Sequence, residues 1–232
     1  MTPIFPHPPP VLAPVSDGRA FPVSRIFCIG QNYADHAKEM GSVATPQAPF
    51  FFTKWAQTVV PGGGTIAYPP QTQDYHHEVE LVVALASGGR DIAEADALDH
   101  VFGYAVGLDM TRRDLQAEAK GKGRPWDVAK NVEQSAPLGP IRPASEVGHP
   151  SAGAISLTVN GEVRQHGDLS DMMLGVPALI AHLSRFYALG AGDLIFTGTP
   201  AGVGPVVPGD RLVGSVAGLD ALEVTIGASA HG

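Results

Sequence analysis

The sequence predicts a β-rich α+β fold built around one domain. Its 232 residues include 28 glycines and 21 prolines, and only 7% are aromatic, which indicates many turns and short strands rather than long helices. Hydrophobic residues make up 44% of the chain, enough for a sizeable core. Residues 1–20 are rich in proline and are predicted to form an extended arm, which leaves residues 21–232 as a single domain.

Composition also limits the partners and the compartment that we expect. The formal net charge is −8, so no extended basic surface is available and nucleic acid is not an expected partner. The single cysteine, Cys28, cannot form an internal disulfide, which fits a reducing compartment. No apolar run approaches the roughly 18 residues that span a bilayer, and the start MTPIFPHPPP does not resemble a secretory signal. We therefore expect a soluble, cytoplasmic protein that binds no membrane.

A short helix is predicted after the first buried strand. RIFCIG at residues 25–30 is typical of a buried strand, and QNYADHAKEMG follows with Asn32 as N-cap and Gly41 at the C-terminal end. His36 and Glu39 lie three residues apart, which on a helix places both on one face within reach of each other. From this spacing alone, a solvated surface pair is the simpler interpretation and a catalytic pair is the alternative.

The most informative stretch is YHHEVELVVALA at residues 75–86. Successive side chains of a strand point to opposite faces, so Glu78 and Glu80 share one face while Val79 and Leu81 lie on the other. Two adjacent carboxylates repel each other unless a cation neutralises them or the pKa of one is raised. Mg²⁺, Mn²⁺ and Ca²⁺ prefer oxygen ligands, so a metal site is one interpretation. The solvent-exposed face of an antiparallel strand is the other.

Asp109 ends a second apolar strand within the segment GYAVGLDMT. Thr111 and Asp114 are predicted to form a capping box, so the strand passes directly into a helix. Functional side chains favour such junctions because the strand fixes the backbone and the turn exposes the side chain. An ordinary acidic residue near a helix N-terminus is an equally good interpretation of Asp109.

The next segment, KGKGRPWDVAKNVEQSAPLGP, is predicted to be a long loop, and long ordered loops in compact domains are usually functional. Lys130 lies in this loop between apolar neighbours. Partial desolvation would lower the pKa of Lys130 and suit it to stabilising a negative oxygen, whereas a plain surface lysine is the alternative.

The last third of the chain alternates turns, one helix and strands. Asn160 and Gly161 predict a type I′ hairpin turn, and MMLGVPALIAHLSRFYALG predicts an amphipathic helix that is closed by Gly190. The loop after DLIFTGTP is not a phosphate-binding P-loop, because no Gly-Lys-Ser/Thr follows its glycines. Thr197 and Thr199 are either ligand contacts or ordinary turn residues.

The segments QNYADHAKEMG, PFFFTK, DYHHEVELVVAL, GYAVGLDMTRRDLQ, GRPWDVAK, VNGEVRQ and DLIFTGTPAGVG occur in this order. Together they resemble the fumarylacetoacetate hydrolase family over residues 20–226. The resemblance implies a mixed β-sandwich roll with short peripheral helices, usually a homodimer, with Mg²⁺ or Mn²⁺ held by three carboxylates. The positions that it implies are the metal ligands Glu78, Glu80 and Asp109, the catalytic residues His36, Glu39 and Lys130, and the substrate-binding residues Thr199, Gly198, Lys54, Arg113 and Gln116.

Two departures from the family pattern concern the substrate. The family usually continues with Gly-Phe-Asp after the lysine at position 130, whereas this chain has Asn131-Val132-Glu133. Lys54 is followed by Trp55, where a proline is common in the family. Both segments border the pocket in the family, so the departures affect the expected substrate more than the expected reaction.

The activity implied for domain 21–232 is hydrolysis of the C–C bond of an acylpyruvate, a small 2-oxo acid such as fumarylpyruvate, in the gentisate pathway of aromatic catabolism. Two alternatives stay open. One is decarboxylation or isomerisation of a related 2-oxo acid such as oxaloacetate, and the other is a non-catalytic ligand-binding member of the fold. A fumaryl carboxylate would need a cation at the far end of the pocket, and the candidates for it are Lys54, Arg112, Arg113 and Arg124.

Overall fold

The computed structural model describes residues 3–6, 8–41 and 49–229, and it confirms a β-rich fold. The largest sheet is mixed and has the strand order β4-β3-β15-β8-β9-β11-β5, with β12 paired beside β9. Its strands are β3 (Arg25–Ile29), β4 (Phe51–Trp55), β5 (Val59–Pro61), β8 (Val79–Leu85), β9 (Val101–Leu108), β11 (Ala136–Leu138), β12 (Arg142–Pro143) and β15 (Leu194–Phe196).

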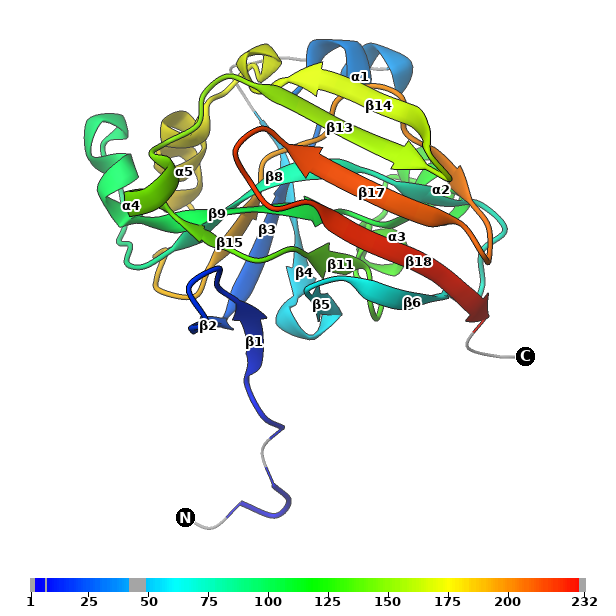
Figure 1. Cartoon of the computed structure of the whole chain (residues 1–232), viewed down its shortest axis with the longest axis horizontal. Helices are drawn as coiled ribbons and strands as arrows, with labels where there is room; N and C mark the ends of the chain where they lie inside the picture. Colours follow the sequence, from blue (N-terminus) through cyan, green and yellow to red (C-terminus); the bar gives the residue numbers. More distant parts are fainter. Residues whose placement is uncertain (1–2, 7, 42–48, 230–232) are drawn as a thin grey trace.

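A second sheet of five strands packs across the first and has the order β14-β13-β17-β18-β6 (Figure 1). Positive φ angles at Asn160 (53°) and Gly161 (84°) confirm the predicted type I′ turn between two of its strands. The five strands are β6 (Gly64–Tyr68), β13 (Ala154–Val159), β14 (Glu162–Asp168), β17 (Arg211–Val216) and β18 (Leu222–Ser229).

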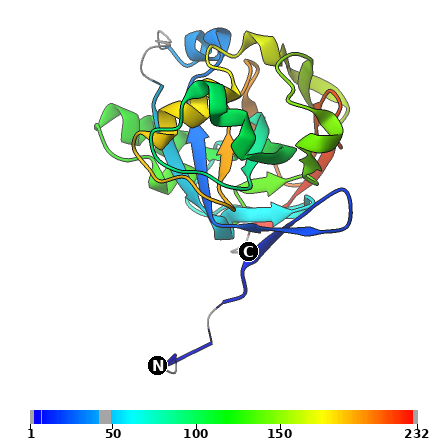
Figure 2. The same ribbon diagram turned by 90° about the vertical axis from the view of Figure 1, so that its left-hand side faces the viewer.

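Smaller elements complete the structure. The hairpin β1 (Val11–Pro14) and β2 (Ala20–Val23) lies at one edge of the molecule, and residues 8–10 directly before it lead away from the body (Figures 1 and 2). This hairpin crosses the predicted boundary between the arm 1–20 and the domain 21–232, and that division stays a prediction. The remaining strands, β7 (Tyr75–His77), β10 (Thr111–Arg112) and β16 (Gly204–Val206), form a three-stranded sheet.

The helices are all short. The α-helices are α1 (Ala34–Glu39), α2 (Arg113–Gly121), α3 (Asp127–Lys130), α4 (Ala144–Val147) and α5 (Val176–Ser184), and the 3₁₀ helices are η1 (Ala56–Thr58), η2 (Glu94–His100) and η3 (Leu169–Asp171). Among the described residues, none of the helices has the length and apolar character needed to cross a bilayer.

The two faces of the eight-stranded sheet have different neighbours. Leu81 and Val83 of β8 join the core that is shared with the five-stranded sheet. Val82 and Ala84 point to the opposite face, where they form a second core with the β1–β2 hairpin. Because side chains alternate along a strand, Glu80 lies on this second face as well, beyond the end of its apolar part.

Several local predictions need correction. The strand predicted over residues 75–86 is broken at Glu78, because β7 pairs with β10 and β16 whereas β8 pairs with β9 and β15. Helix α1 has Tyr33 as N-cap, whereas the Asn32 side chain bonds the backbone of Leu174 and Thr197. Long-range contacts of this kind compete with local capping and have no signal in the sequence.

The predicted capping box at the start of α2 is also absent. The Thr111 hydroxyl donates to the Asp109 carbonyl oxygen, and Asp114 accepts from Thr72 instead. The long loop after α2 contains α3 and β11, and α5 ends at Ser184, before the predicted Gly190.

Candidate active site

Three buried carboxylates meet at the end of the eight-stranded sheet. Glu78 lies between β7 and β8, Glu80 is the second residue of β8, and Asp109 directly follows β9. One oxygen from each of the three lies within 4.8 Å of the others. The exposed fractions of the residues are 5%, 1% and 1%, respectively. The pairing of β8 with β9 continues past the strand ends, where the Asp109 N–H donates to the Glu78 carbonyl oxygen at 2.9 Å, and this pairing brings the three predicted metal ligands together.

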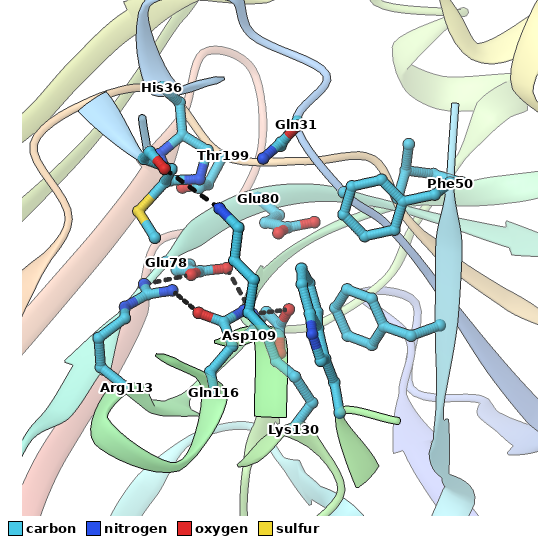
Figure 3. Close-up of a pocket in the computed structure, with 16 residues that line it drawn as sticks. Gln31, His36, Phe50, Glu78, Glu80, Asp109, Arg113, Gln116, Lys130 and Thr199 are labelled. Carbon is cyan, nitrogen blue, oxygen red and sulfur yellow. Dashed lines mark hydrogen bonds and ion pairs between the residues drawn. The ribbon is translucent and has the colours of Figure 1, made fainter. Parts of the chain in front are cut away.

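Two cations contact these carboxylates from α2 and α3 (Figure 3). Lys130 Nζ donates to Glu78 Oε2 and to Asp109 Oδ2, both at 2.8 Å. Arg113 Nη2 donates to Glu78 Oε1 at 2.5 Å and uses another nitrogen to bond Gln116. Glu78 therefore has two cationic partners in the pocket.

Glu80 has a different environment. Its Oε2 accepts a hydrogen bond from the Gly198 N–H at 2.7 Å, and within the described part of the chain it forms no ion pair. Gly198 has a φ of +100°, and a Cβ there would lie 2.8 Å from Asn32 Cβ, so the close approach of this loop requires glycine. Gly198 was predicted to bind substrate, but its N–H is used to hold Glu80.

The pKa values of Glu80 and Glu78 are shifted in opposite directions. Burial raises the pKa of Glu80 well above its ordinary value, and the negative charges of Asp109 and Glu78 raise it further. Burial alone would also raise the pKa of Glu78, but Lys130 and Arg113 outweigh burial and lower it. Ionisation of Glu80 is therefore unfavourable unless a cation compensates its charge.

The prediction that the pKa of Lys130 is lowered is wrong. Burial by itself lowers the pKa of Lys130, but Asp109 and Glu78 outweigh this effect and the net pKa is raised. The apolar neighbours in the sequence indicated the burial correctly, but they gave no sign of the two carboxylates. Lys130 is therefore a firmly charged donor.

Lys54 lies behind the carboxylates and not in the pocket, which corrects its predicted contact with substrate. Its fully buried ammonium group donates to the carbonyl oxygens of Met110, Lys130 and Ser135. It also lies 2.9 Å from Asp109 Oδ1. This pair is not aligned as a hydrogen bond, so Asp109 Oδ1 has no hydrogen-bond partner among the described residues.

These observations fit a divalent cation. Glu80 carries a buried carboxylate without an ion pair, Asp109 Oδ1 is buried beside Lys54 but accepts no hydrogen bond, and Glu78 completes a set of oxygen atoms. Hard cations such as Mg²⁺ and Mn²⁺ prefer such ligands over nitrogen or sulfur. The residues present can therefore hold the predicted metal.

His36 and Glu39 form a pair on α1, as their spacing suggested. His36 Nδ1 lies 3.2 Å from Glu39 Oε2, and both carboxylate oxygens of Glu39 accept from the Gly202 N–H at 3.1 and 3.2 Å. His36 is buried and lines the same pocket as the three carboxylates (Figure 3). It is therefore not the solvated surface residue of the simpler interpretation.

Thr199 lines the pocket, but its hydroxyl group is already used. The hydroxyl donates to the Val79 carbonyl oxygen at 2.8 Å and accepts from Gln165 Nε2 at 2.7 Å. The hydroxyl therefore has no proton left for a substrate carboxylate, and the contact of Thr199 with substrate stays a prediction. Neighbouring Thr197 donates to the Leu81 carbonyl oxygen and has no free proton either.

Helix α2 presents one residue that the sequence interpretation missed. Arg113, Gln116 and Lys120 are separated by three and four residues, so they lie along one face of the helix, and all three line the pocket. Lys120 Nζ donates to the Met40 carbonyl oxygen at 3.3 Å. The helical spacing from Arg113 was the available signal for Lys120.

The predicted distal cations Arg112 and Arg124 do not line this pocket. Arg112 donates to the carbonyl oxygens of Pro70 and Val128, and Arg124 is exposed beside Glu118. An aromatic wall, which the sequence interpretation also missed, consists of Phe50, Phe52 and Trp126.

Comparisons with known proteins identify the family of this chain. The family described as fumarylacetoacetate (FAA) hydrolase C-terminal matches residues 25–227. A fumarylpyruvate hydrolase of a Ralstonia species is 47% identical over 178 residues, which cover 77% of this chain and 92% of that protein. An oxaloacetate tautomerase of Escherichia coli (strain K12) is 44% identical over 193 residues, which cover 83% and 88%. The crystal structure of fumarylpyruvate hydrolase from Pseudomonas aeruginosa in complex with Mn²⁺ and pyruvate has a TM-score of 0.95 and 48% identity, and the match covers 98% of this chain and 100% of that one.

Proposed function

This chain belongs to the fumarylacetoacetate hydrolase family, and from this premise we propose that it hydrolyses the C–C bond of an acylpyruvate. The proposed substrate is fumarylpyruvate, and the products are fumarate and pyruvate. The names of the relatives from Ralstonia and Pseudomonas aeruginosa support this choice. The predicted homodimer and cytoplasmic location remain part of the proposal, and light scattering would check the first of them.

The observation that carries the proposal is the position of His36. Hydrolysis needs a base that faces the reacting carbon, and His36 lines the pocket above the three carboxylates. Its Nδ1 is engaged by Glu39, so Nε2 is the nitrogen that can accept a proton from water. The Gly202 N–H fixes Glu39 and so indirectly orients the imidazole.

Glu78, Glu80 and Asp109 would hold Mg²⁺ or Mn²⁺ in this proposal. When bound, the ion supplies a Lewis acid for the carboxylate and the adjoining carbonyl oxygen of a 2-oxo acid. The pyruvate end of the substrate would accordingly lie next to these three residues.

In the proposed reaction, His36 transfers the proton and Lys130 stabilises negative charge. His36 Nε2 takes a proton from water as the water oxygen bonds to the distal acyl carbonyl carbon. When the C–C bond breaks, its electron pair passes to the pyruvate carbon, and His36 returns the proton to that carbon. Lys130 uses two of its three N–H donors on Glu78 and Asp109, so the third is available for a negative oxygen.

The far side of the pocket suits a planar acyl group with a carboxylate. Phe50, Phe52 and Trp126 provide an apolar wall, and Gln116 and Lys120 extend along α2 away from Arg113. At 1.5 Å per residue, Arg113 and Lys120 are separated by about 10 Å along the helix. The seven-carbon chain of fumarylpyruvate spans about 8 Å at ordinary C–C bond lengths, which supports Lys120 as the partner of the distal carboxylate.

Isomerisation of oxaloacetate is the second candidate, and one finding favours it. The relative from Escherichia coli at 44% identity is an oxaloacetate tautomerase. Keto–enol conversion moves a proton between carbon and oxygen without an attacking water, and His36 suits that step too. Oxaloacetate is shorter than fumarylpyruvate and would not reach Lys120.

A substrate panel tests the proposal. The protein with Mg²⁺ or Mn²⁺ would be assayed with fumarylpyruvate, acetylpyruvate and oxaloacetate, and the loss of the absorbance of the enolic diketone would report hydrolysis. We expect kcat/KM to be highest for fumarylpyruvate. Rapid oxaloacetate tautomerisation without hydrolysis of either acylpyruvate would instead establish the second candidate.

A further inference from the structure

Gln165 is a buried amide at the end of the VNGEVRQ segment, and the proposed chemistry does not use it. It lies on β14 of the five-stranded sheet and has no exposed surface. Its side chain nevertheless reaches the strand and the loop that carry the candidate site. Four hydrogen bonds form the Gln165 network: Oε1 with His77 Nδ1 (2.9 Å) and Val79 N (3.1 Å), and Nε2 with Thr199 Oγ1 (2.7 Å) and the Pro200 carbonyl oxygen (2.9 Å).

Two backbone groups fix the orientation of this amide. The Val79 N–H can only donate, and the Pro200 carbonyl oxygen can only accept, so Oε1 must face Val79 and Nε2 must face Pro200. It follows that His77 Nδ1 carries a proton and donates to Oε1. Thr199 accepts from Nε2 and therefore donates its own proton to the Val79 carbonyl oxygen. Every donor in the Gln165 network thus has an acceptor.

The Gln165 network surrounds the positions of two candidate metal ligands. Glu78 lies between His77 and Val79, the two residues that bond to Oε1. On the other side, Gly198 directly precedes the two residues that bond to Nε2, and the Gly198 N–H holds Glu80. One amide therefore connects the backbone around Glu78 to the loop that positions Glu80.

We propose that Gln165 is a positioning residue that sets the affinity for the divalent cation by fixing Glu78 relative to Glu80. It acts through backbone and side-chain neighbours and touches neither substrate nor metal. This inference rests on the proposed metal role of Glu78, Glu80 and Asp109. Substitutions of residues that orient metal ligands typically weaken metal binding by about 10–100-fold.

The test compares Gln165→Met with a core variant of the same sheet, Leu212→Ala. Methionine has a similar length but makes none of the four hydrogen bonds, whereas Leu212 is fully buried on β17 and belongs to the general core. The Kd for Mn²⁺ would be measured by calorimetry on each full-length protein, and thermal unfolding would be recorded without metal. We expect both variants to be less stable, but only Gln165→Met to bind Mn²⁺ about 10–100-fold more weakly.

Three outcomes would overturn the inference. They are a Kd of Gln165→Met within twofold of that of the unmodified protein, an equal loss of affinity in Leu212→Ala, and no Mn²⁺ binding by the unmodified protein. The last of these would remove the metal role itself, whereas the first two would leave it intact.

A second variant decides the matter if Gln165→Met does not fold. Thr199→Val keeps the shape of the side chain but removes the acceptor for Nε2 and the donor to Val79. Weaker Mn²⁺ binding in this variant would support the inference, and an unchanged Kd would overturn it.

Discussion

One face of the eight-stranded sheet has an apolar half and a carboxylate half on the same strands. Along β8, Val82 and Ala84 pack under the β1–β2 hairpin, whereas Glu80 faces the pocket. Along β9 and the residue that follows it, Ala105 belongs to the apolar half and Asp109 to the carboxylate half. Positions on the same face of the same strands therefore belong either to the apolar core or to the candidate site.

The two halves are held by different forces. The apolar half is held by close packing and burial, which stabilise without directional bonds. The carboxylate half is held by donors from elsewhere in the chain, namely Lys130, Arg113 and the Gly198 N–H. A buried carboxylate such as Glu80 costs stability unless a cation compensates it. Substitutions in the two halves should therefore change different measured quantities.

The largest effect is expected for Glu80→Ala. This variant should lose Mn²⁺ binding and with it all turnover, because the carboxylate without a cationic partner is removed. Its thermal stability without metal should be equal to or above that of the unmodified protein, because Asp109 and Glu78 no longer face a third carboxylate. Calorimetry with Mn²⁺ and thermal unfolding would measure the two quantities. Normal activity in a demonstrably metal-free preparation would contradict the metal assignment.

The second effect concerns the base that faces the carboxylate half. His36→Ala should lower kcat for hydrolysis by about 10²–10⁴-fold, the usual contribution of general base catalysis, with an unchanged Kd for Mn²⁺. Asp35→Asn, an exposed change on the same helix, is the matched control. Any oxaloacetate decarboxylation should decrease less, because it needs no attacking water. An equal decrease of both reactions in folded, metal-loaded His36→Ala would rule out His36 as the hydrolytic base.

The third effect belongs to the apolar half. Ile26→Ala on β3 should lower the free energy of unfolding by about 2–5 kcal/mol, the usual cost of truncating a large buried aliphatic side chain. Ile26 is fully buried in the second core. Denaturant unfolding would measure the loss, and the Kd for Mn²⁺ at a temperature where the variant is folded should not change. A large change in this Kd would mean that the two halves are coupled.

The parts of the site that follow from local periodicity could be predicted from the sequence. The two-residue repeat of a strand placed Glu78 with Glu80, and the three-residue spacing on a helix placed His36 beside Glu39. The β-rich fold and the turn at residues 160–161 followed from composition and from Asn-Gly chemistry. These features depend on residues that are close together in the chain.

The features that could not be predicted depend on contacts between distant segments. Lys54 is 55 residues from Asp109 in the sequence, and nothing near it indicates that its ammonium group lies behind that carboxylate. The sequence left open whether Thr199 contacts a ligand, and nothing near it indicates that its hydroxyl accepts from Gln165 of the other sheet. The raised pKa of Lys130 likewise requires knowledge of Asp109 and Glu78. Tertiary electrostatics therefore limited the site prediction more than secondary structure did.

The smallest effect should come from the helix that borders the pocket. If Lys120 pairs with the distal carboxylate of fumarylpyruvate, Lys120→Met should raise KM for this substrate about 10-fold, the equivalent of about 1.4 kcal/mol for one charged hydrogen bond. The KM for acetylpyruvate, whose acyl group has no charge, should change little, and kcat should be nearly constant for both substrates.

The control variant is Lys122→Met, which removes the same charge from an exposed lysine that pairs with Glu118 and so reports the general electrostatic effect of a lysine in this region. Equal changes of KM for the two substrates in Lys120→Met would place Lys120 outside substrate recognition while leaving the hydrolase proposal intact. A selective change would explain how this chain accepts long acylpyruvates, because Lys120, about two helical turns along α2 from Arg113, would bind the distal carboxylate of the substrate.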